Sequence, residues 1–232
     1  MKTNRGCRPV LHYLIASCLL LGTYAFADSD SMNCNEKPPA IHATLAPADQ
    51  NSAGHLQLSR KIAAGASISL NVCDADLTIK GSNGDQLQVT VDLGNPVAKL
   101  NAGDYLQVLE VTPQGARLKL DLPKRVRAKV LIVMPAATDD MEVNLVRGDL
   151  TLEADRIAGE RNINVVRGHM DFLGNPDSYE GLHVNVVMGS MHDHRKGGED
   201  HHFMVSQSYG GTGKGSVDIN VVMGSVDLKA WD

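Results

Sequence analysis

One ten-residue pattern occurs four times in the second half of the chain and constrains the fold more than any other feature. The copies are VNLVRGDLTL (143–152), INVVRGHMDF (163–172), VNVVMGSMHD (184–193) and INVVMGSVDL (219–228). Apolar and polar residues alternate before and after a central glycine, which indicates strands with one buried face. The two alternations are out of phase, which indicates a bulge or corner, because glycine adopts backbone angles that other residues avoid. Each copy therefore predicts a strand, a corner and a second strand.

The spacing of the copies predicts how they stack. The first three begin at Val143, Ile163 and Val184, and the fourth begins at Ile219. Two-stranded steps of about 20 residues are typical of a β-solenoid or β-helix, in which stacked rungs share one continuous core. The longer step before the last copy predicts an insertion loop at about 194–215, while the other copies pass directly from one rung to the next. A fifth, degenerate copy, LNVCDADLTI (70–79), has an alanine in place of the glycine.

The aligned copies also predict which side chains are buried. In the first two copies these are the alternating apolar residues Val143, Leu145, Leu150, Leu152, Ile163, Val165, Met170 and Phe172. An asparagine recurs at one position of every copy, as Asn71, Asn144, Asn164, Asn185 and Asn220. Side-chain amides both donate and accept hydrogen bonds, so asparagines aligned on neighbouring rungs can form a ladder. We assign them this structural role rather than a binding role.

The rest of the chain after residue 27 also has the pattern of strands. Segments such as HLQLSRKI, QLQVTVDL and RAKVLIVMP alternate, and turns such as GSNGD and LGNP separate them. No segment predicts a helix of more than two turns. Residues 28–54 are polar and contain prolines, which predicts an extended leader. We therefore expect an all-β fold with a single β-repeat domain at 55–232.

The first 27 residues have the layout of a secretory signal peptide. A basic start is followed by a mostly apolar segment at 10–22 and by a small-x-small site, Ala25-Phe26-Ala27. The apolar segment is short for a membrane span, which needs about 20 residues. Cys18 ends a lipobox-like IASC, but the apolar LLLG after it argues against lipid anchoring. We expect cleavage after Ala27 and an exported protein, located in the periplasm or at the cell surface.

Charge and cysteine content agree with export. Three of the 22 lysines and arginines lie in the first 27 residues, so 19 basic residues remain against 27 acidic ones, a net charge of −8. Such a chain is not expected to bind nucleic acid or an anionic membrane, and no later segment is apolar enough to span a membrane. Cys34 and Cys73 remain after cleavage, and two cysteines in an oxidising compartment most often pair. The alternative is one buried and one exposed free thiol.

The glycine-centred repeats also carry a family resemblance. An apolar strand that ends in VMP (133–135) and is followed by VNLVRGDLTL-type repeats resembles the bacterial putative-adhesin domains of unknown function. The resemblance covers roughly residues 55–232 and is a likeness of architecture. It implies an exported β-helical repeat protein with an adhesion or envelope role, and it carries over no catalytic residue. The histidine-rich insertion departs from the family's plain pattern.

The segment HDHRKGGEDHH (192–202) holds the residues best suited to metal binding. Its candidate ligands are His192, His194, His201 and His202, with Asp193 or Glu199 completing or orienting the set. Imidazoles and carboxylates suit zinc, copper or nickel. His192 and His194 should point the same way if the strand continues through them. The alternative is a solvated loop whose histidines titrate on mild acidification. We expect no cofactor, and zinc or copper at these histidines is the alternative.

Two short motifs have structural explanations. The RGD at 147–149 aligns with RGH, MGS and MGS in the other copies, so its glycine belongs to the repeat corner. The GGTGKGS at 210–216 lacks the glycine spacing and the Ser or Thr after lysine that a phosphate-binding loop requires. We interpret the second motif as a flexible turn and expect neither receptor binding nor phosphate binding.

The leading functional prediction is a non-enzymatic, adhesin-like binding or structural module of the cell envelope, whose partner is an envelope or surface protein or polysaccharide. The sequence contains no nucleophile elbow and no zinc-protease motif. The alternative is a periplasmic divalent-metal-binding protein that uses residues 192–202. A polysaccharide-acting β-helix enzyme is a third possibility, disfavoured because only 4% of residues are aromatic and sugar-binding clefts usually offer aromatic rings.

Overall fold

The computed structural model describes residues 42–43, 45–47, 49–94, 102–122, 126–154 and 158–231. Within them the fold is all-β, as predicted, apart from one short 3₁₀ turn. The elements are β1 (His42–Ala43), β2 (Gln50–Ser52), β3 (His55–Lys61), β4 (Ser67–Ser82), β5 (Gln86–Asp92), η1 (Ala102–Asp104), β6 (Leu106–Thr112), β7 (Gly115–Leu120), β8 (Ala128–Pro135), β9 (Met141–Glu153), β10 (Glu160–Leu173), β11 (Gly181–Asp193), β12 (Asp200–His202), β13 (Val205–Gly210) and β14 (Ser216–Lys229).

The predicted signal peptide and Cys34 lie outside the described residues, so cleavage and the Cys34–Cys73 pairing stay predictions. Part of the segment predicted to be an extended leader is in the sheet, because β2 pairs antiparallel with β3. Asp49, just before β2, accepts two hydrogen bonds of 2.5 Å from the Arg60 guanidinium of β3. Among the described residues, no helix is long and apolar enough to cross a membrane.

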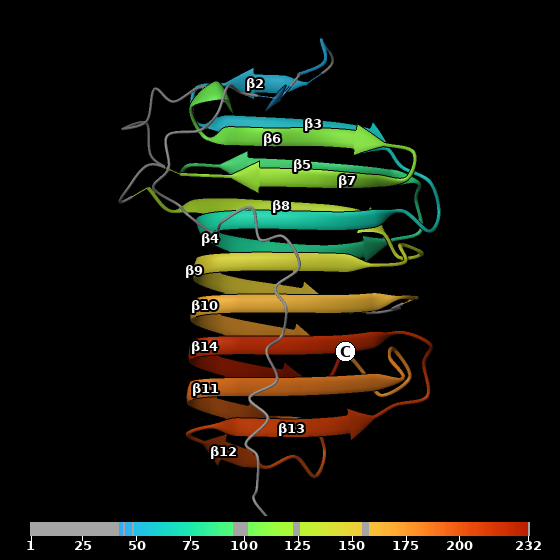
Figure 1. The fold of residues 1–232 in the computed structure, drawn as a ribbon, viewed down its shortest axis with the longest axis vertical. Helices are drawn as coiled ribbons and strands as arrows, with labels where there is room; N and C mark the ends of the chain where they lie inside the picture. The colour runs from blue at the N-terminus through green and yellow to red at the C-terminus, as the bar shows by residue number, and fades with distance from the viewer. Residues whose placement is uncertain are drawn as a thin grey trace, which may run out of the picture. The chain divides into compact units, whose positions relative to one another are not determined.

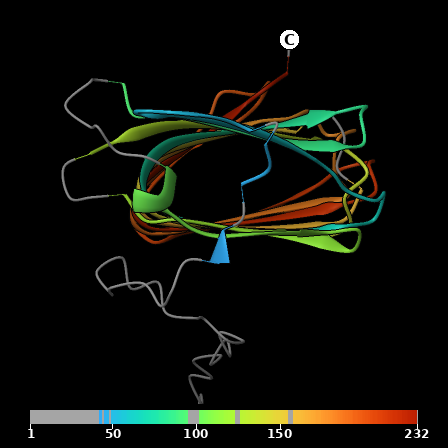
Figure 2. The ribbon, with the colours of Figure 1, turned by 90° about the horizontal axis from the view of Figure 1, so that it is seen from above.

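The strands form one 14-stranded sheet that bends into two layers (Figures 1 and 2). The long strand β4 shows how the layers arise. Its first part, 67–72, pairs with β7, and its last part, 75–82, pairs with β8. Both β7 and β8 are parallel to β4, but they extend different layers. Each of the long strands β9, β10, β14 and β11 contributes to both layers. The core lies between the two layers.

The four copies of the repeat are the strands β9, β10, β14 and β11, which pair in parallel with identical register. Gly168 pairs with Gly148 on one side and with Gly224 on the other, and Gly224 pairs with Gly189. All four glycines have positive φ angles, between 132° and 156°. Each copy is one continuous strand of 13 or 14 residues rather than two strands, and its glycine has the unusual backbone angle that the predicted corner required.

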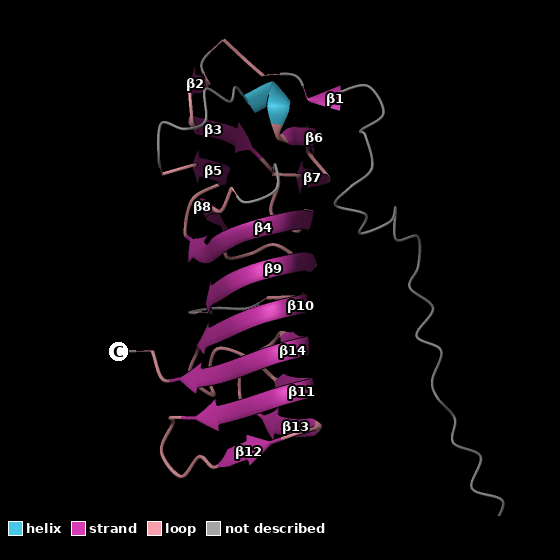
Figure 3. Ribbon diagram, turned by 90° about the vertical axis from the view of Figure 1, so that its left-hand side faces the viewer, coloured by secondary structure: helices cyan, strands magenta, loops and turns pink. Residues whose placement is uncertain are grey.

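The order of these strands in the sheet differs from their order in the chain. β14, the fourth copy, lies between β10 and β11, so the second and third copies are not neighbours (Figure 3). The prediction that each copy passes directly to the next rung is wrong at this point. The other edge of β11 is covered by β12 and β13, which pair with it antiparallel. The predicted insertion loop at 194–215 thus contains two strands, which shield an edge that would otherwise expose unpaired backbone groups.

The core and the asparagine ladder agree with the sequence predictions. All eight predicted core residues of the first two copies are at most 4% exposed. The asparagine side chains are joined in the order of the rungs, since the amide nitrogen of each one after the first donates to the carbonyl oxygen of the asparagine on the preceding rung over 3.0 to 3.2 Å. The ladder runs through Asn71, Asn144, Asn164, Asn220 and Asn185, and Ser206 of β13 donates to the last of them.

The glycines are required by close stacking as well as by their φ angles. A Cβ atom built on Gly168 would collide with the carbonyl oxygen of Gly148, and the same collision recurs from Gly224 to Gly168 and from Gly189 to Gly224. At the start of the column, a Cβ on Gly148 would strike the carbonyl oxygen of Ala75. Since Ala75 is absent from the residues with positive φ, the degenerate copy tolerates its alanine at the end of this glycine column.

Candidate functional site

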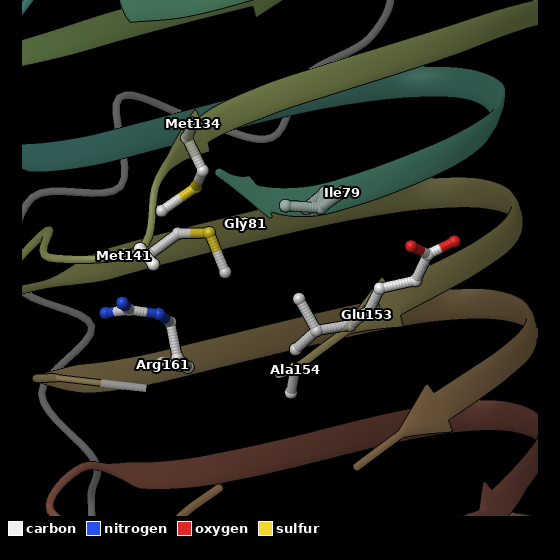
Figure 4. Close-up of a pocket in the computed structure, with 9 residues that line it drawn as sticks. Ile79, Gly81, Met134, Met141, Glu153, Ala154 and Arg161 are labelled. Carbon is white, nitrogen blue, oxygen red and sulfur yellow. The ribbon is translucent and has the colours of Figure 1, made fainter. Parts of the chain in front are cut away.

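A small hollow lies beside β4, β8 and β10, but it cannot hold a substrate. It offers about 20 Å³, room for one water molecule, whereas ligand sites usually enclose hundreds of cubic ångströms. Its lining includes Ile79, Met134, Met141 and Arg161 (Figure 4). Arg161 is buried, and its guanidinium donates to the Thr138 carbonyl and hydroxyl oxygens over 3.1 and 3.0 Å.

Arg161 therefore has a structural role. Burial lowers its pKa to about 10, against the opposing influence of Asp140 and Asp139. A further hydrogen bond of 3.0 Å goes to the Asp139 carbonyl oxygen. Because these hydrogen bonds occupy its guanidinium, Arg161 stabilises the turn between β8 and β9 rather than binding an anion in the hollow.

Exposed apolar side chains gather at the corners of the last three rungs. We call this set the apolar ridge: Val222 and Met223 of β14, Val187 and Met188 of β11, and Phe203 and Met204 between β12 and β13. Met188 and Met223 are partners in the strand register, and the Phe203 amide donates to the Gly189 carbonyl oxygen over 2.8 Å. The three corners are thus neighbours. A contiguous exposed apolar surface on a soluble fold usually marks an interaction site.

Phe203 and Met204 are held in an unfavourable backbone conformation. Their φ angles are 60° and 51°, and they are the only non-glycine residues with positive φ in the described part of the chain. This left-handed region costs roughly 1–2 kcal/mol per residue for residues other than glycine, asparagine and aspartate. The two side chains are also 67% and 68% exposed, so side-chain packing does not offset the unfavourable backbone energy. Strain of this kind tends to persist where function selects it.

The apolar ridge replaces a charged corner in the earlier rungs. Asp74 of β4 faces Arg147 of β9, with 3.6 Å between carboxylate and guanidinium. Arg167 of β10 follows, and its guanidinium lies 3.3 Å from the sulfur of Met223, where the apolar residues begin. The corner therefore changes from ionic to apolar along the stack, with an exposed arginine at the boundary.

The structure brings together three of the four predicted metal ligands. The rings of His192 and His194 are stacked with centroids 6.3 Å apart, which confirms that they share a face, and His202 lies 5.7 Å from His192. His201 is not part of this group of rings. It pairs across the strands with the buried Met191, and its Nδ1 lies 3.4 Å from Gln207 Nε2.

The predicted auxiliary ligands, Asp193 and Glu199, have different surroundings. Glu199 is exposed in the turn before β12. Asp193 is 8% exposed and accepts hydrogen bonds from the Arg195 side chain over 2.6 and 2.8 Å. Burial alone would raise the pKa of Asp193, but the bonds from Arg195 outweigh it and lower the pKa. Arg195 also donates to the Tyr179 hydroxyl over 2.7 Å and stacks on the Tyr209 ring. This cluster therefore links β13, which holds Tyr209, to the turn before β11, which holds Tyr179.

A second group of ligand-type residues was missed from the sequence. His169, Asp171 and Asp227 place one nitrogen and two carboxylate oxygens within 4.8 Å of one another. They come from two copies of the repeat that are neighbours only because β14 lies beside β10. Aligning the copies puts Asp171 and Asp227 at the same position, the third residue after the glycine, which was a usable signal. The rung order, which brings Asp227 of β14 beside His169 and Asp171 of β10, could not be predicted from the sequence.

The two short motifs have partners within the fold. In the RGD segment, Arg147 faces Asp74, and Asp149 accepts a 2.7 Å bond from Arg127. The GGTGKGS segment is a turn, as predicted, but it is bound to the backbone of residues 176–180 rather than free. The amides of Gly211 and Gly213 donate to the carbonyl oxygens of Glu180 and Tyr179 over 2.7 and 2.8 Å. Its glycines permit this close approach.

Comparisons with known proteins leave the family open. No family model matches the chain, and no curated protein matches it in sequence. A crystal structure of a putative cell adhesion protein from Clostridium sporogenes is similar over 75% of this chain and 99% of that one, with 15% identity and a TM-score of 0.43. A putative lipid binding protein from Parabacteroides distasonis (77% of this chain, 97% of that one) has 11% identity and a TM-score of 0.22. A putative adhesin from Parabacteroides merdae (76% of this chain, 77% of that one) has 9% identity and a TM-score of 0.25. These partial likenesses establish neither family nor function.

Proposed function

We propose that the protein is an exported, non-enzymatic, adhesin-like module of the cell envelope, and that it binds a protein partner through the apolar ridge. In this proposal the parallel rungs are a β-solenoid-type scaffold that presents its corners to the partner. The observation that carries the proposal is the exposure of Phe203 and Met204 at positive φ. Both the exposure and the backbone conformation are unfavourable for the isolated protein, and a bound partner would offset them.

The composition of the ridge favours a protein partner. Methionine, phenylalanine and arginine are enriched at protein interfaces, and the ridge holds Met188, Met204, Met223 and Phe203 with Arg167 at its boundary. A polysaccharide presents hydroxyl groups that need polar partners, which these side chains lack. An anionic membrane would repel a chain whose expected mature charge is −8. We therefore expect the partner's contact surface to be apolar and to carry an acidic group that pairs with Arg167.

The test is site-specific photo-crosslinking in cells that express the full chain. A photo-reactive amino acid at position 204 should give a discrete protein adduct, and the added Phe203→Asn substitution should reduce its yield. The same probe at Lys129, an exposed position on β8 away from the ridge, serves as the matched control. Adducts no stronger than those at position 129, or adducts with lipid or polysaccharide alone, would refute the proposed partner class.

A stability measurement separates binding from folding. Asparagine adopts the left-handed conformation more readily than phenylalanine or methionine. The double variant Phe203→Asn/Met204→Asn should therefore melt at the same temperature as the wild type or above it, while losing the partner. This pattern is typical of residues kept for function at some cost in stability. A clearly lower melting temperature would instead identify the two side chains as packing residues.

A further inference from the structure

Histidines and carboxylates converge on the strand segments that follow the corner glycines of β10 and β14. His169 and Asp171 lie on β10, and Asp227 lies on the neighbouring β14. His169 Nε2 is 3.0 Å from Asp171 Oδ1 and 4.0 Å from Asp227 Oδ2. His194 follows the last residue of β11, and its Nε2 lies 3.2 Å from the same oxygen of Asp227. His169, Asp171 and Asp227 thus place their ligand atoms within 4.8 Å of one another, and His194 adjoins this group at Asp227.

The two carboxylates require a cation between them. Asp171 and Asp227 are direct partners across parallel strands, and like charges at such positions repel one another. The Lys229 ammonium supplies the charge, with Nζ 2.5 Å from Asp171 Oδ1 and 3.8 Å from Asp227 Oδ2. Burial acts to raise the pKa of Asp171, but the bonds from Lys229 and His169 outweigh it and lower the pKa. The Lys229 side chain is 39% exposed, so an ammonium displaced by a metal would enter solvent.

The donor set and spacing fit a transition metal. Neighbouring ligands around tetrahedral zinc are about 3.3 Å apart, given bond lengths of about 2.0–2.1 Å. The distances of 3.0, 3.2 and 4.0 Å within the cluster need only small shifts to match this value. The other ring nitrogen of His169, Nδ1, lies 2.8 Å from the Ser225 hydroxyl. A hydrogen bond of this kind commonly orients a metal-binding imidazole.

We infer that His169, Asp171 and Asp227 form a binding site for a divalent transition metal such as zinc, with His194 as the fourth ligand. Imidazole ligands favour zinc, copper or nickel over calcium and magnesium, which prefer oxygen alone. Lys229 competes with the metal for the two carboxylates. This site differs from the set predicted in the 192–202 segment, because His201 faces away and His192 is engaged by Ser190 and Asp200 at 2.9 and 3.2 Å.

Calorimetric titration of the full chain with zinc chloride tests the site. The wild type should bind one ion, and His169→Ala and Asp227→Asn should each weaken binding by about tenfold or more. Ser225→Ala, which removes only the orienting hydroxyl, should weaken it by about tenfold. Lys229→Met should tighten it by about tenfold, because the metal no longer displaces a charge-assisted hydrogen bond. His183→Ala is the matched control, since His183 lies on β11 before the corner glycine and contacts Ser208 of β13.

The Lys229→Met variant keeps the test decisive even if a ligand variant fails to fold, because the expected change is a gain. Melting curves of each variant report folding separately. An unchanged affinity in Lys229→Met would overturn the inference. So would loss of binding in His201→Ala/His202→Ala with full binding in His169→Ala, since that result would place the metal at the β12 segment. Absence of binding in both the wild type and Lys229→Met would identify the cluster as an ion-pair network without a metal.

Discussion

Replacing one corner glycine by alanine tests why the repeat has its form. In Gly168→Ala the new Cβ would lie 2.8 Å from the carbonyl carbon of Gly148 and closer still to its oxygen, where real Cβ atoms keep at least 3.0 Å. The backbone of β9 or β10 must therefore move, and parallel hydrogen bonds on both sides of the corner must lengthen. The φ angle of 155° adds strain, because side-chain-bearing residues rarely adopt it.

The expected loss of stability combines two costs. Overpacking against a backbone that is fixed on both sides costs about 1–3 kcal/mol, and the left-handed backbone adds about 1–2 kcal/mol. A total of about 2–5 kcal/mol corresponds to a fall in melting temperature of roughly 4–20 °C for a chain of this size. Thermal unfolding followed by circular dichroism measures the change, and urea titration gives the free energy of unfolding.

Two control variants separate the costs. Gly94→Ala has the positive φ, 75°, with nothing within 4 Å of the new Cβ, so it should lose only the strain energy of about 1 kcal/mol. Gly210→Ala has open space and no such φ, so its stability should be close to that of the wild type. If Gly168→Ala is no less stable than Gly94→Ala, the claim that in-register stacking excludes a side chain at this corner is wrong.

Three further predictions concern the parts that fasten the fold. Arg195→Met removes the guanidinium partner of the buried Asp193 carboxylate, so denaturant titration should show a loss of about 3 kcal/mol and earlier proteolysis after β11. A carboxylate with a lowered pKa stabilises the fold above its unfolded pKa of about 3.9, so Asp193 and Asp49 should contribute stability at neutral pH that acid unfolding curves show being lost below about pH 4. Cys34 should be bonded to Cys73, adding about 3–4 kcal/mol, and mass spectrometry of the unreduced, denatured protein should find no alkylatable thiol at either position.

The strands and their buried faces could be predicted because the information is local. Alternation around each glycine identifies Val165 and Phe172 as inward-facing whatever the neighbouring rung is, and both are at most 1% exposed. The asparagine ladder was predictable for the same reason, since Asn164 has an equivalent asparagine on either side. These predictions depend on register within a copy and not on the order of the copies.

The order of the rungs was not predictable, because the copies are interchangeable at their edges. Any copy that presents the same residues can pair with any other, so local pattern does not distinguish β11 from β14 as the neighbour of β10. The strands β12 and β13, which are antiparallel to β11, determine the order: they cover one edge of β11 and leave its other edge to pair with β14. The cluster of His169 with Asp227 depends on this order, and so does the junction of Arg167 with Met223. Both candidate surfaces were therefore invisible to the pattern of a single copy.

Methionine oxidation in intact cells tests most directly whether the apolar ridge is occupied by a partner. Met188, Met204 and Met223 are exposed, whereas Met170 and Met191 are fully buried and serve as internal controls. In the purified protein, hydrogen peroxide should convert the three exposed residues to sulfoxides rapidly and the two buried ones slowly. In cells, mass spectrometry should find Met188, Met204 and Met223 protected, at rates closer to those of the buried pair. Oxidation of the three ridge methionines as fast in cells as in the purified protein would contradict the account.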